Sequence, residues 1–375
     1  MPKVTELPST IKEWETAMAK MGLTGQTVHG ATLASASKFE YKHFLLLQVL
    51  WVEGHVENLS KSLPDIDKWI SKAKEKLATY KSWNTYCQGF TGLNIEEGSF
   101  AVARHYQLEV IKTESEIDPW SLTTPIARRT RTRDRAKGLT SKFSDMLLET
   151  PSKSTNIPKI LDDDDSGSDD LFETPTPEPK SSFQEKSPIS KELENTIYPP
   201  TKDEQIVNAA LVIFLNTLTI PFSLINNWTL HRKAFKAEFE EASYEARTDG
   251  YLSDLQGNAQ VIIEVKPVLR SAKLVAIQMQ ESAQMVAWIK SDDESSNKSK
   301  KVRLHLSQDR DEIYLTVAMY DDKYIDYLKN KNQLPCFMTM RQFGPWNILN
   351  DNNMRYLGPL LLAISLRAQA GDEEN

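Results

Sequence analysis

Cysteine is scarce in this chain of 375 residues, because only Cys87 and Cys336 are present and they lie far apart. Two distant cysteines exclude a disulfide framework and indicate a reducing, intracellular compartment. Residues 1–10 are polar and contain two prolines, which predicts no signal peptide. The most apolar stretch, 207–224, is interrupted by asparagines and a proline, so we expect a buried helix there and no membrane partner.

Positive charge is in the minority as well. The chain has 45 Lys and Arg against 52 Asp and Glu, and its formal net charge is −7. Nonspecific binding of nucleic acid needs a basic surface, so such binding must depend on local clusters of Lys and Arg. The histidines of residues 1–127 show no metal-ligand spacing with one another or with Cys87, which argues against a zinc site there.

Composition divides the chain into four segments. Residues 1–127 carry apolar residues at helical spacing and predict a mainly α-helical N-terminal domain. Residues 128–200 are rich in proline and charge but poor in large apolar side chains, which predicts a disordered linker. Residues 201–370 show mixed helix and strand patterns and predict an α/β domain, and 371–375 form a polar tail. Within the N-terminal domain we expect helices at 11–21, 40–57 and 62–83. The segment 100–117 fits a helix or a strand, and we favour the helix.

The first two segments give few functional signals. The N-terminal domain contains no catalytic constellation, and we expect it to bind a protein partner that the sequence does not identify. The linker begins with a basic run, 128–137, and contains an acidic block, 162–170. The basic run is typical of a nuclear import signal or of a nonspecific phosphate tether, but a solvated linker patch explains it equally well.

The chemistry of the chain centres on residues 247–267, RTDGYLSDLQGNAQVIIEVKP. Glycine and asparagine at 257 and 258 tolerate the positive φ of a tight turn. The run after them, 260–268, is rich in β-branched residues, which favour strands. The stretch therefore predicts a β-hairpin, whose first strand belongs to the run 244–255.

Two registers of this hairpin are open. A two-residue turn at 256–257 places Asp249 opposite Glu264, whereas a turn at 257–258, or one of four residues, places Asp249 opposite Lys266. Both registers keep the three charged side chains on one face, because side chains alternate with a period of two. Two carboxylates that close repel each other, and a divalent cation such as Mg²⁺ relieves the conflict.

The apolar residues next to these charges help to decide between a buried metal site and an exposed salt-bridge cluster. Val261, Ile263 and Val265 point to one side of the strand, and Ile262 stands beside Glu264 on the other. A strand that is apolar on both faces predicts a sheet covered on both sides, where charges are costly unless they are paired or bound to metal. The alternative is a salt-bridge cluster on an exposed hairpin, which would contribute little.

At these residues the chain resembles the PD-(D/E)XK nuclease superfamily. The resemblance rests on Asp249 and on Glu264-Val265-Lys266 at the end of an apolar strand, although Thr248 stands where the family has its first proline. The resemblance implies a restriction-endonuclease-like αβββαβ core, with a mixed sheet flanked by helices. It further implies a nuclease in which Asp249, Glu264 and the Val265 carbonyl hold Mg²⁺ or Mn²⁺, while Lys266 orients the attacking water.

The elements expected around the hairpin follow the same order. They are a helix from 201 to about 218, a strand at 228–239, a helix at 271–289, a hairpin of strands at 302–307 and 312–319, and a final helix at 353–368. The helix–strand–hairpin–helix–strand succession supports the resemblance, because a chance motif need not be framed in this way.

Three further polar residues are candidates for the same site. The resemblance implies a glutamate on the first helix, and Glu204 is the candidate, although a capping box that begins at Thr201 also explains it. The family also places a polar residue on the helix after the hairpin. Gln280 and Gln284 lie one turn apart and could share a face there, but surface glutamines of a good helix former are the alternative.

Candidate nucleic-acid contacts form two groups. They are Arg232, Lys233 and Lys236 on the strand before the hairpin, and Lys298, Lys300 and Lys301 before the strand at 302. Such residues also protect edge strands from aggregation. We expect a nucleic-acid partner, DNA in preference to RNA, that the chain either cleaves as a metal-dependent nuclease or binds without cleaving.

Overall fold

The computed structural model describes residues 4–91, 98–112, 202–292, 302–332 and 334–373. Within these ranges, Met1–Glu114 and Pro200–Asn375 belong to one compact unit. The predicted linker at 128–200, with its basic and acidic runs, lies outside the described residues, and so do the candidates Lys298, Lys300 and Lys301.

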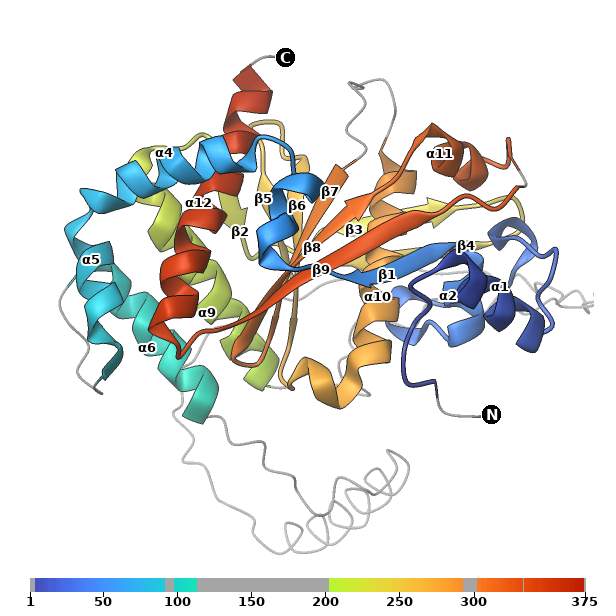
Figure 1. Ribbon diagram of the computed structural model, residues 1–375, viewed down its shortest axis with the longest axis horizontal. Helices are drawn as coiled ribbons and strands as arrows, with labels where there is room; N and C mark the ends of the chain where they lie inside the picture. Colours follow the sequence, from blue (N-terminus) through green and yellow to red (C-terminus); the bar gives the residue numbers. More distant parts are fainter. Residues whose placement is uncertain (1–3, 92–97, 113–201, 293–301, 333, 374–375) are drawn as a thin grey trace, which may run out of the picture. The chain divides into compact units, whose positions relative to one another are not determined.

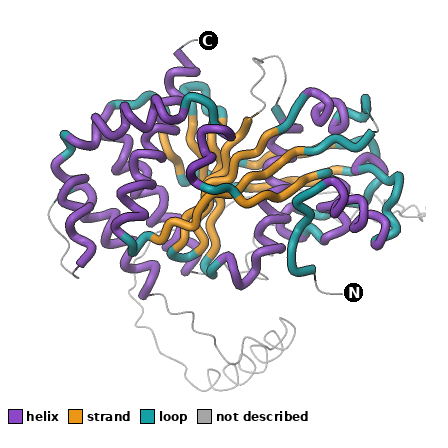
Figure 2. The backbone as a smooth tube through the Cα atoms, in the orientation of Figure 1, coloured by secondary structure: helices purple, strands orange, loops and turns teal. Residues whose placement is uncertain are grey.

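A mixed sheet of seven strands forms the centre of this unit (Figures 1 and 2). The strands, in spatial order, are β1 (Val49–Glu53), β9 (Met338–Asn347), β8 (Glu312–Met319), β7 (Val302–Asp309), β6 (Ala259–Lys266), β5 (Gly250–Ser253) and β2 (Asn227–Thr229). Neighbours run antiparallel except for two parallel pairs, β6 with β7 and β1 with β9. The helix α10 (Arg270–Ser291) makes the crossover that the parallel pair β6–β7 requires.

Helices cover both faces of the sheet (Figure 1). On one side lie α4 (Ile66–Ala78), α5 (Lys81–Gln88), α6 (Ser99–Lys112), α9 (Lys202–Thr219) and α12 (Asp351–Glu373). On the other lie α1 (Ile11–Lys20), α2 (Tyr41–Leu46), α10, α11 (Asp322–Leu328) and a two-stranded sheet of β3 (Ala234–Glu238) and β4 (Ser243–Arg247). The short helix α3 (Leu59–Ser62) precedes α4. The C-terminal part is therefore a mixed sheet flanked by helices, as predicted.

Strand β6 shows why its sequence is apolar on both faces. Val261, Ile263 and Val265 belong to the core on the α9 and α12 side. Ile262 belongs to the core on the α10 side, and alternation places Glu264 on that same side. Because both faces are covered, the strand is a nearly continuous apolar run, and Glu264 is its one buried carboxylate.

The N-terminal part is mainly helical, as predicted, but it is not a separate domain. The expected helix at 40–57 ends at Leu46, and Gln48 has a left-handed φ of 54°. The chain then continues as β1, which pairs in parallel with β9 and so extends the sheet of the C-terminal part. Valine and tryptophan at 49–52 favour a strand, and pairing with β9 satisfies their main-chain groups. The predicted boundary between domains 1–127 and 201–370 is therefore wrong.

Two predicted strands are each divided between two sheets. The run 228–239 forms β2 in the main sheet and β3 in the small one, and the run 244–255 forms β4 and β5 in the same way. Gly250 makes the second crossing possible, because a Cβ atom there would lie 2.4 Å from the Thr229 carbonyl oxygen. Strand β9 and helix α11 were not predicted, and α12 extends to Glu373, into the expected tail.

Helix α9 and the turn after it, Glu204–Phe222, are long and apolar enough to cross a membrane by length and composition alone, a test that core helices also pass. In this structure Val207, Leu211, Phe214 and Leu218 are buried in the core beside the sheet. This burial is what the interrupted apolar stretch predicted.

Candidate functional site

The site lies where the chain passes from β4 to β5, beside the end of β6. Strand β5 pairs with β6 so that Gly250 is opposite Ile263, and one further step brings Asp249 opposite Glu264. The main-chain amide of Asp249 donates to the Ile263 carbonyl at 2.9 Å, which holds Asp249 beside the end of β6. Of the two registers predicted, the first is the observed one.

The turn that produces this register differs from the two-residue turn expected. Residues 254–258 form a loop in which the Asn258 amide donates to the Asp254 carboxylate at 2.6 Å, and Gly257 has a φ of 82°. The register then shifts, because Leu252 pairs with Val261 while Ser253 pairs with Ala259. A bulge in β6 thus restores the alignment that the longer loop alone would have changed.

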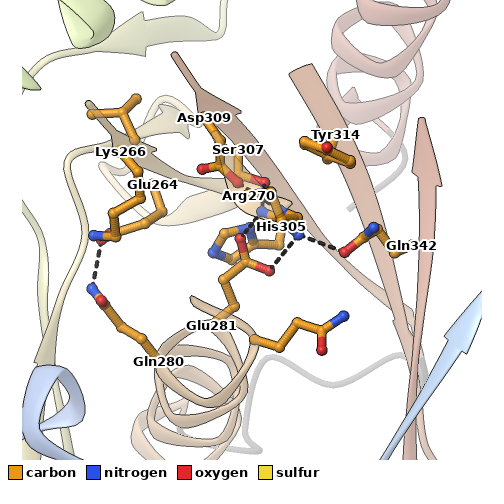
Figure 3. A network of polar contacts seen from close by, with 12 residues as sticks. Glu264, Lys266, Arg270, Gln280, Glu281, His305, Ser307, Asp309, Tyr314 and Gln342 are labelled. Carbon is orange, nitrogen blue, oxygen red and sulfur yellow. Dashed lines mark hydrogen bonds and ion pairs between the residues drawn. The ribbon is translucent and has the colours of Figure 1, made fainter. Parts of the chain in front are cut away.

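Glu264 is buried, with 4% of its side chain exposed, and donors surround its carboxylate. Gln280 Nε2 donates to Oε1 and Gln284 Nε2 donates to Oε2, each at 2.5 Å. Lys266, two residues along the strand, forms an ion pair with Oε1 (Figure 3). The predicted shared face of the two glutamines is therefore real, and it is turned towards Glu264.

Asp249 is held from three sides. Its Oδ2 accepts a hydrogen bond from the Val265 amide at 3.1 Å, and its Oδ1 lies 3.3 Å from the Arg232 guanidinium. Its main-chain carbonyl accepts a hydrogen bond from Asn208 on α9 at 3.0 Å. Burial, followed by the charge of Glu264, raises the pKa of Asp249 from 3.8 to about 7.

Glu204 and Lys266 complete the charged group. Burial alone would lower the pKa of the Lys266 ammonium, but the carboxylates of Glu264, Asp249 and Glu204 outweigh burial and raise it. The charge of Glu204 also contributes to the raised pKa of Asp249. Glu204 on α9 therefore lies within electrostatic reach of the site, whereas Thr201, the expected cap, is outside the described residues.

A second network, largely buried, adjoins this group and is centred on Arg270. The guanidinium forms ion pairs with Glu281 and, at 2.5 Å, with Asp309, and it donates to Ser307 at 2.8 Å and to Gln342 at 2.5 Å (Figure 3). In the β6–β7 register, Ser307 is the partner of Glu264 and Asp309 is the partner of Lys266. The network thus lies beside the two charged residues of β6, on the neighbouring strand β7.

One cation and two carboxyls in the Arg270 network shift the pKa values of one another. Burial would lower the pKa of Arg270, but Glu281 and Asp309 outweigh it and raise the pKa. Burial likewise favours the neutral form of Glu281, yet the charge of Arg270 outweighs it and lowers the pKa of that carboxyl. Burial raises the pKa of Asp309 to about 6, despite the opposing charge of Arg270.

Sequence reasoning missed several of these residues. Arg270, Ser307 and Asp309 are not among the predicted site residues. The predicted strand ends at 307, whereas β7 continues to Asp309, and residues 305, 307 and 309 are polar at a period of two along it. His305, expected to pack, is buried, and its Nε2 lies 3.1 Å from Gln284 Oε1. Asn208 is not among the predicted site residues either, although it lies one helical turn from Glu204, a spacing that places both on one face.

The three described candidates for nucleic-acid contact have different surroundings. Arg232 is the one that contacts an acidic residue of the site. Lys233 donates to the Gly257 carbonyl at 2.7 Å and lies 5.0 Å from the centre of the Tyr251 ring. Lys236 is exposed and pairs with Glu238 on the same strand at 2.5 Å.

The donor set bears on metal binding. Within the described residues, no group of three or more His, Cys, Asp or Glu side chains is arranged to hold a metal ion. Asp249 and Glu264 provide two carboxylates, and Mg²⁺ is usually bound through one or two carboxylates together with water and substrate phosphates. Burial, and next the charge of Glu264, disfavour the ionised form of Asp249, and a bound cation would favour it. The residues present therefore fit a divalent cation of this open kind.

Comparisons with protein-family models, with curated proteins and with solved structures found no match to this chain.

Proposed function

We propose that this chain is a metal-dependent nuclease that hydrolyses phosphodiester bonds at Asp249, Glu264 and Lys266, with a core of the PD-(D/E)XK type. One observation carries the proposal: two carboxylates and an amine meet on one face of a covered sheet, and burial with mutual repulsion raises the pKa of Asp249 to about 7. Perturbed carboxyls with a specific charged partner are typical of catalytic sites.

The residues of the chain divide the work of the reaction. Asp249, Glu264 and the Val265 carbonyl would hold Mg²⁺ or Mn²⁺, which when bound supplies charge neutralisation and acidifies the attacking water. Lys266 would donate hydrogen bonds to the phosphate oxygens as negative charge develops there. Gln280 and Gln284 orient Glu264, and Arg232, which is largely exposed, would contact a neighbouring phosphate. We favour DNA over RNA as substrate and an intracellular, nuclear location.

A second candidate function is binding of nucleic acid without cleavage. The Glu264 carboxylate already accepts hydrogen bonds from two amides and pairs with the Lys266 ammonium, so its charge is compensated without a metal ion. Calorimetric titration with Mn²⁺ separates the two functions. The nuclease requires binding that Asp249→Ala abolishes, whereas a module that only binds nucleic acid requires none.

Cleavage itself should be tested with the full chain, because β1 completes the sheet. Single- and double-stranded DNA and RNA would be incubated with Mn²⁺ or with chelator. We expect cleavage only with Mn²⁺, lost in Glu264→Ala and Lys266→Ala but kept in Lys42→Ala, which removes an exposed ammonium on α2 that pairs with Glu40 at 3.0 Å. Undiminished cleavage in both site variants would reject the assignment.

A further inference from the structure

The N-terminal strand reaches the helix that carries the two glutamines. Trp51 on β1 is buried, and its indole Nε1 donates to the hydroxyl of Ser282 on α10 at 2.8 Å. The same hydroxyl donates to the Gln278 carbonyl at 2.7 Å, so its donor and one acceptor position are both used. The hydroxyl thus joins an N-terminal strand to one specific turn of α10.

That turn is the one that holds Glu264. Ser282 lies between Gln280 and Gln284, and these two amides donate to opposite oxygens of the Glu264 carboxylate. The distances of 2.5 Å leave little freedom for a shift or rotation of α10. Any displacement of Ser282 along the helix axis would therefore move both donors relative to Glu264.

A second link runs in parallel through β9. The Gly54 amide, just after β1, donates to the Gln342 carbonyl at 2.7 Å, and the Gln342 side chain accepts from Arg270 at 2.5 Å (Figure 3). Arg270 in turn pairs with Glu281, the residue between Gln280 and Ser282. Both links connect β1 to residues 280–284 of α10.

We propose that Trp51 is a positioning residue of the Asp249–Glu264–Lys266 site, acting through Ser282 to fix the turn of α10 that orients Glu264. The inference rests on the proposed nuclease function for its kinetic effect. The N-terminal part is then a component of the site, although it contributes no group that touches substrate.

The chain contains a chemically matched control on the other face of the sheet. Trp228 on β2 is also buried, and its Nε1 donates to the hydroxyl of Ser365 on α12 at 3.1 Å. Ser365 donates to the Leu361 carbonyl at 3.2 Å, just as Ser282 donates within α10. Trp51→Phe and Trp228→Phe therefore remove the same kind of hydrogen bond, but only the first touches the helix that holds Glu264.

The experiment uses the full chain labelled with ¹⁵N-glutamine, with the side-chain amide signals of Gln280 and Gln284 assigned from their alanine variants. We expect Trp51→Phe to move both signals, because the hydrogen bond from Trp51 to Ser282 is lost. The less well oriented Glu264 should then lower kcat roughly fivefold, with KM changed by less than about twofold. Trp228→Phe should lower the melting temperature similarly but leave both signals and kcat unchanged. Ser282→Ala, which keeps the packing of Trp51, replaces Trp51→Phe if that variant unfolds.

The outcomes separate this inference from the proposed function. Unmoved amide signals in Trp51→Phe and Ser282→Ala, or equal movement in Trp228→Phe, would overturn the positioning role. A wild-type chain that cleaves nothing would reject the nuclease, and the amide signals alone would then decide whether Trp51 orients Glu264.

Discussion

The Asp249 carboxylate accepts a hydrogen bond from the Val265 amide, and this bond joins the crossing between β4 and β5 to the strand that carries Glu264 and Lys266. A carboxylate fixed at that point cannot move away from Glu264 to relieve repulsion. Burial, and next the charge of Glu264, raise the pKa of this fixed carboxyl, and the rise gives the site a measurable signature.

The first prediction concerns stability against pH. The pKa of Asp249 in the folded protein is about 7, above its ordinary value of 3.8, so the folded state holds this proton more tightly than the unfolded chain does. The contribution of Asp249 to stability therefore falls as the pH rises from about 4 to 7 and is constant above that range. Asp249→Asn should stabilise the metal-free protein at pH 8 by on the order of 2–4 kcal/mol, with little gain at pH 4.

Urea unfolding in the presence of chelator, at both pH values, measures this effect. The asparagine keeps an acceptor for the Val265 amide, so the change isolates the charge. An equal gain at pH 4 and pH 8 would show that the benefit does not come from ionisation of Asp249.

The second prediction concerns Arg232, whose guanidinium lies 3.3 Å from Asp249 while 61% of its side chain is exposed. A cation bound at Asp249 must compete with this positive charge. Arg232→Gln should therefore bind Mn²⁺ about threefold more tightly, yet cleave more slowly because a phosphate contact is lost. Calorimetry and cleavage assays together test the opposite signs. Lys42→Gln, which removes a charge paired with Glu40, should change neither.

The third prediction compares the two glutamines. Gln284 is fully buried, and its amide contacts Glu264, the Arg247 carbonyl and His305, whereas Gln280 is partly buried and donates to Glu264. Gln284→Leu leaves several buried groups without partners and should cost about 2–4 kcal/mol of unfolding free energy, against about 1 kcal/mol for Gln280→Leu. Urea unfolding decides this, and equal losses would contradict the difference in burial and bonding.

The fourth prediction concerns Arg270, which is buried together with Glu281 and Asp309. Arg270→Met leaves two buried carboxyls without their cation and should cost about 3–5 kcal/mol at neutral pH. The pKa of Glu281 should then rise above its unfolded value, and that of Asp309, already raised to about 6, should rise further. The loss should therefore shrink at pH 5, where both carboxyls can be protonated.

The matched control is the triple variant Arg270→Met, Glu281→Gln, Asp309→Asn, which removes all three charges together. Thermal unfolding should show that it regains much of the stability lost in the single variant, because no buried charge is left without a partner. A triple variant as unstable as Arg270→Met at neutral pH would indicate that hydrogen bonding to Ser307 and Gln342, and not charge balance, dominates.

Local pattern was sufficient for the elements that bear most directly on the site. The β-branched run 260–268 identified β6, and the side-chain period of two identified the face that Glu264 shares with Lys266. Helical spacing identified α10 with its two glutamines. These features depend on neighbours within a few residues, which the chain itself specifies. The register of β5 on β6 was limited to two alternatives for the same reason, since parity follows from loop length.

Long-range packing decided the rest. The apolar run at 40–57 could be helix or strand by composition, and only the free edge of β9 makes β1 a strand. The Arg270 network joins residues 270, 281, 307 and 342, which no periodicity connects along the chain. The contact between Trp51 and Ser282 spans 231 positions of sequence. Residues at such separations interact only because the sheet and its helices bring them together. The sequence by itself therefore predicts a separate N-terminal domain, whereas the tertiary structure joins that part to the sheet.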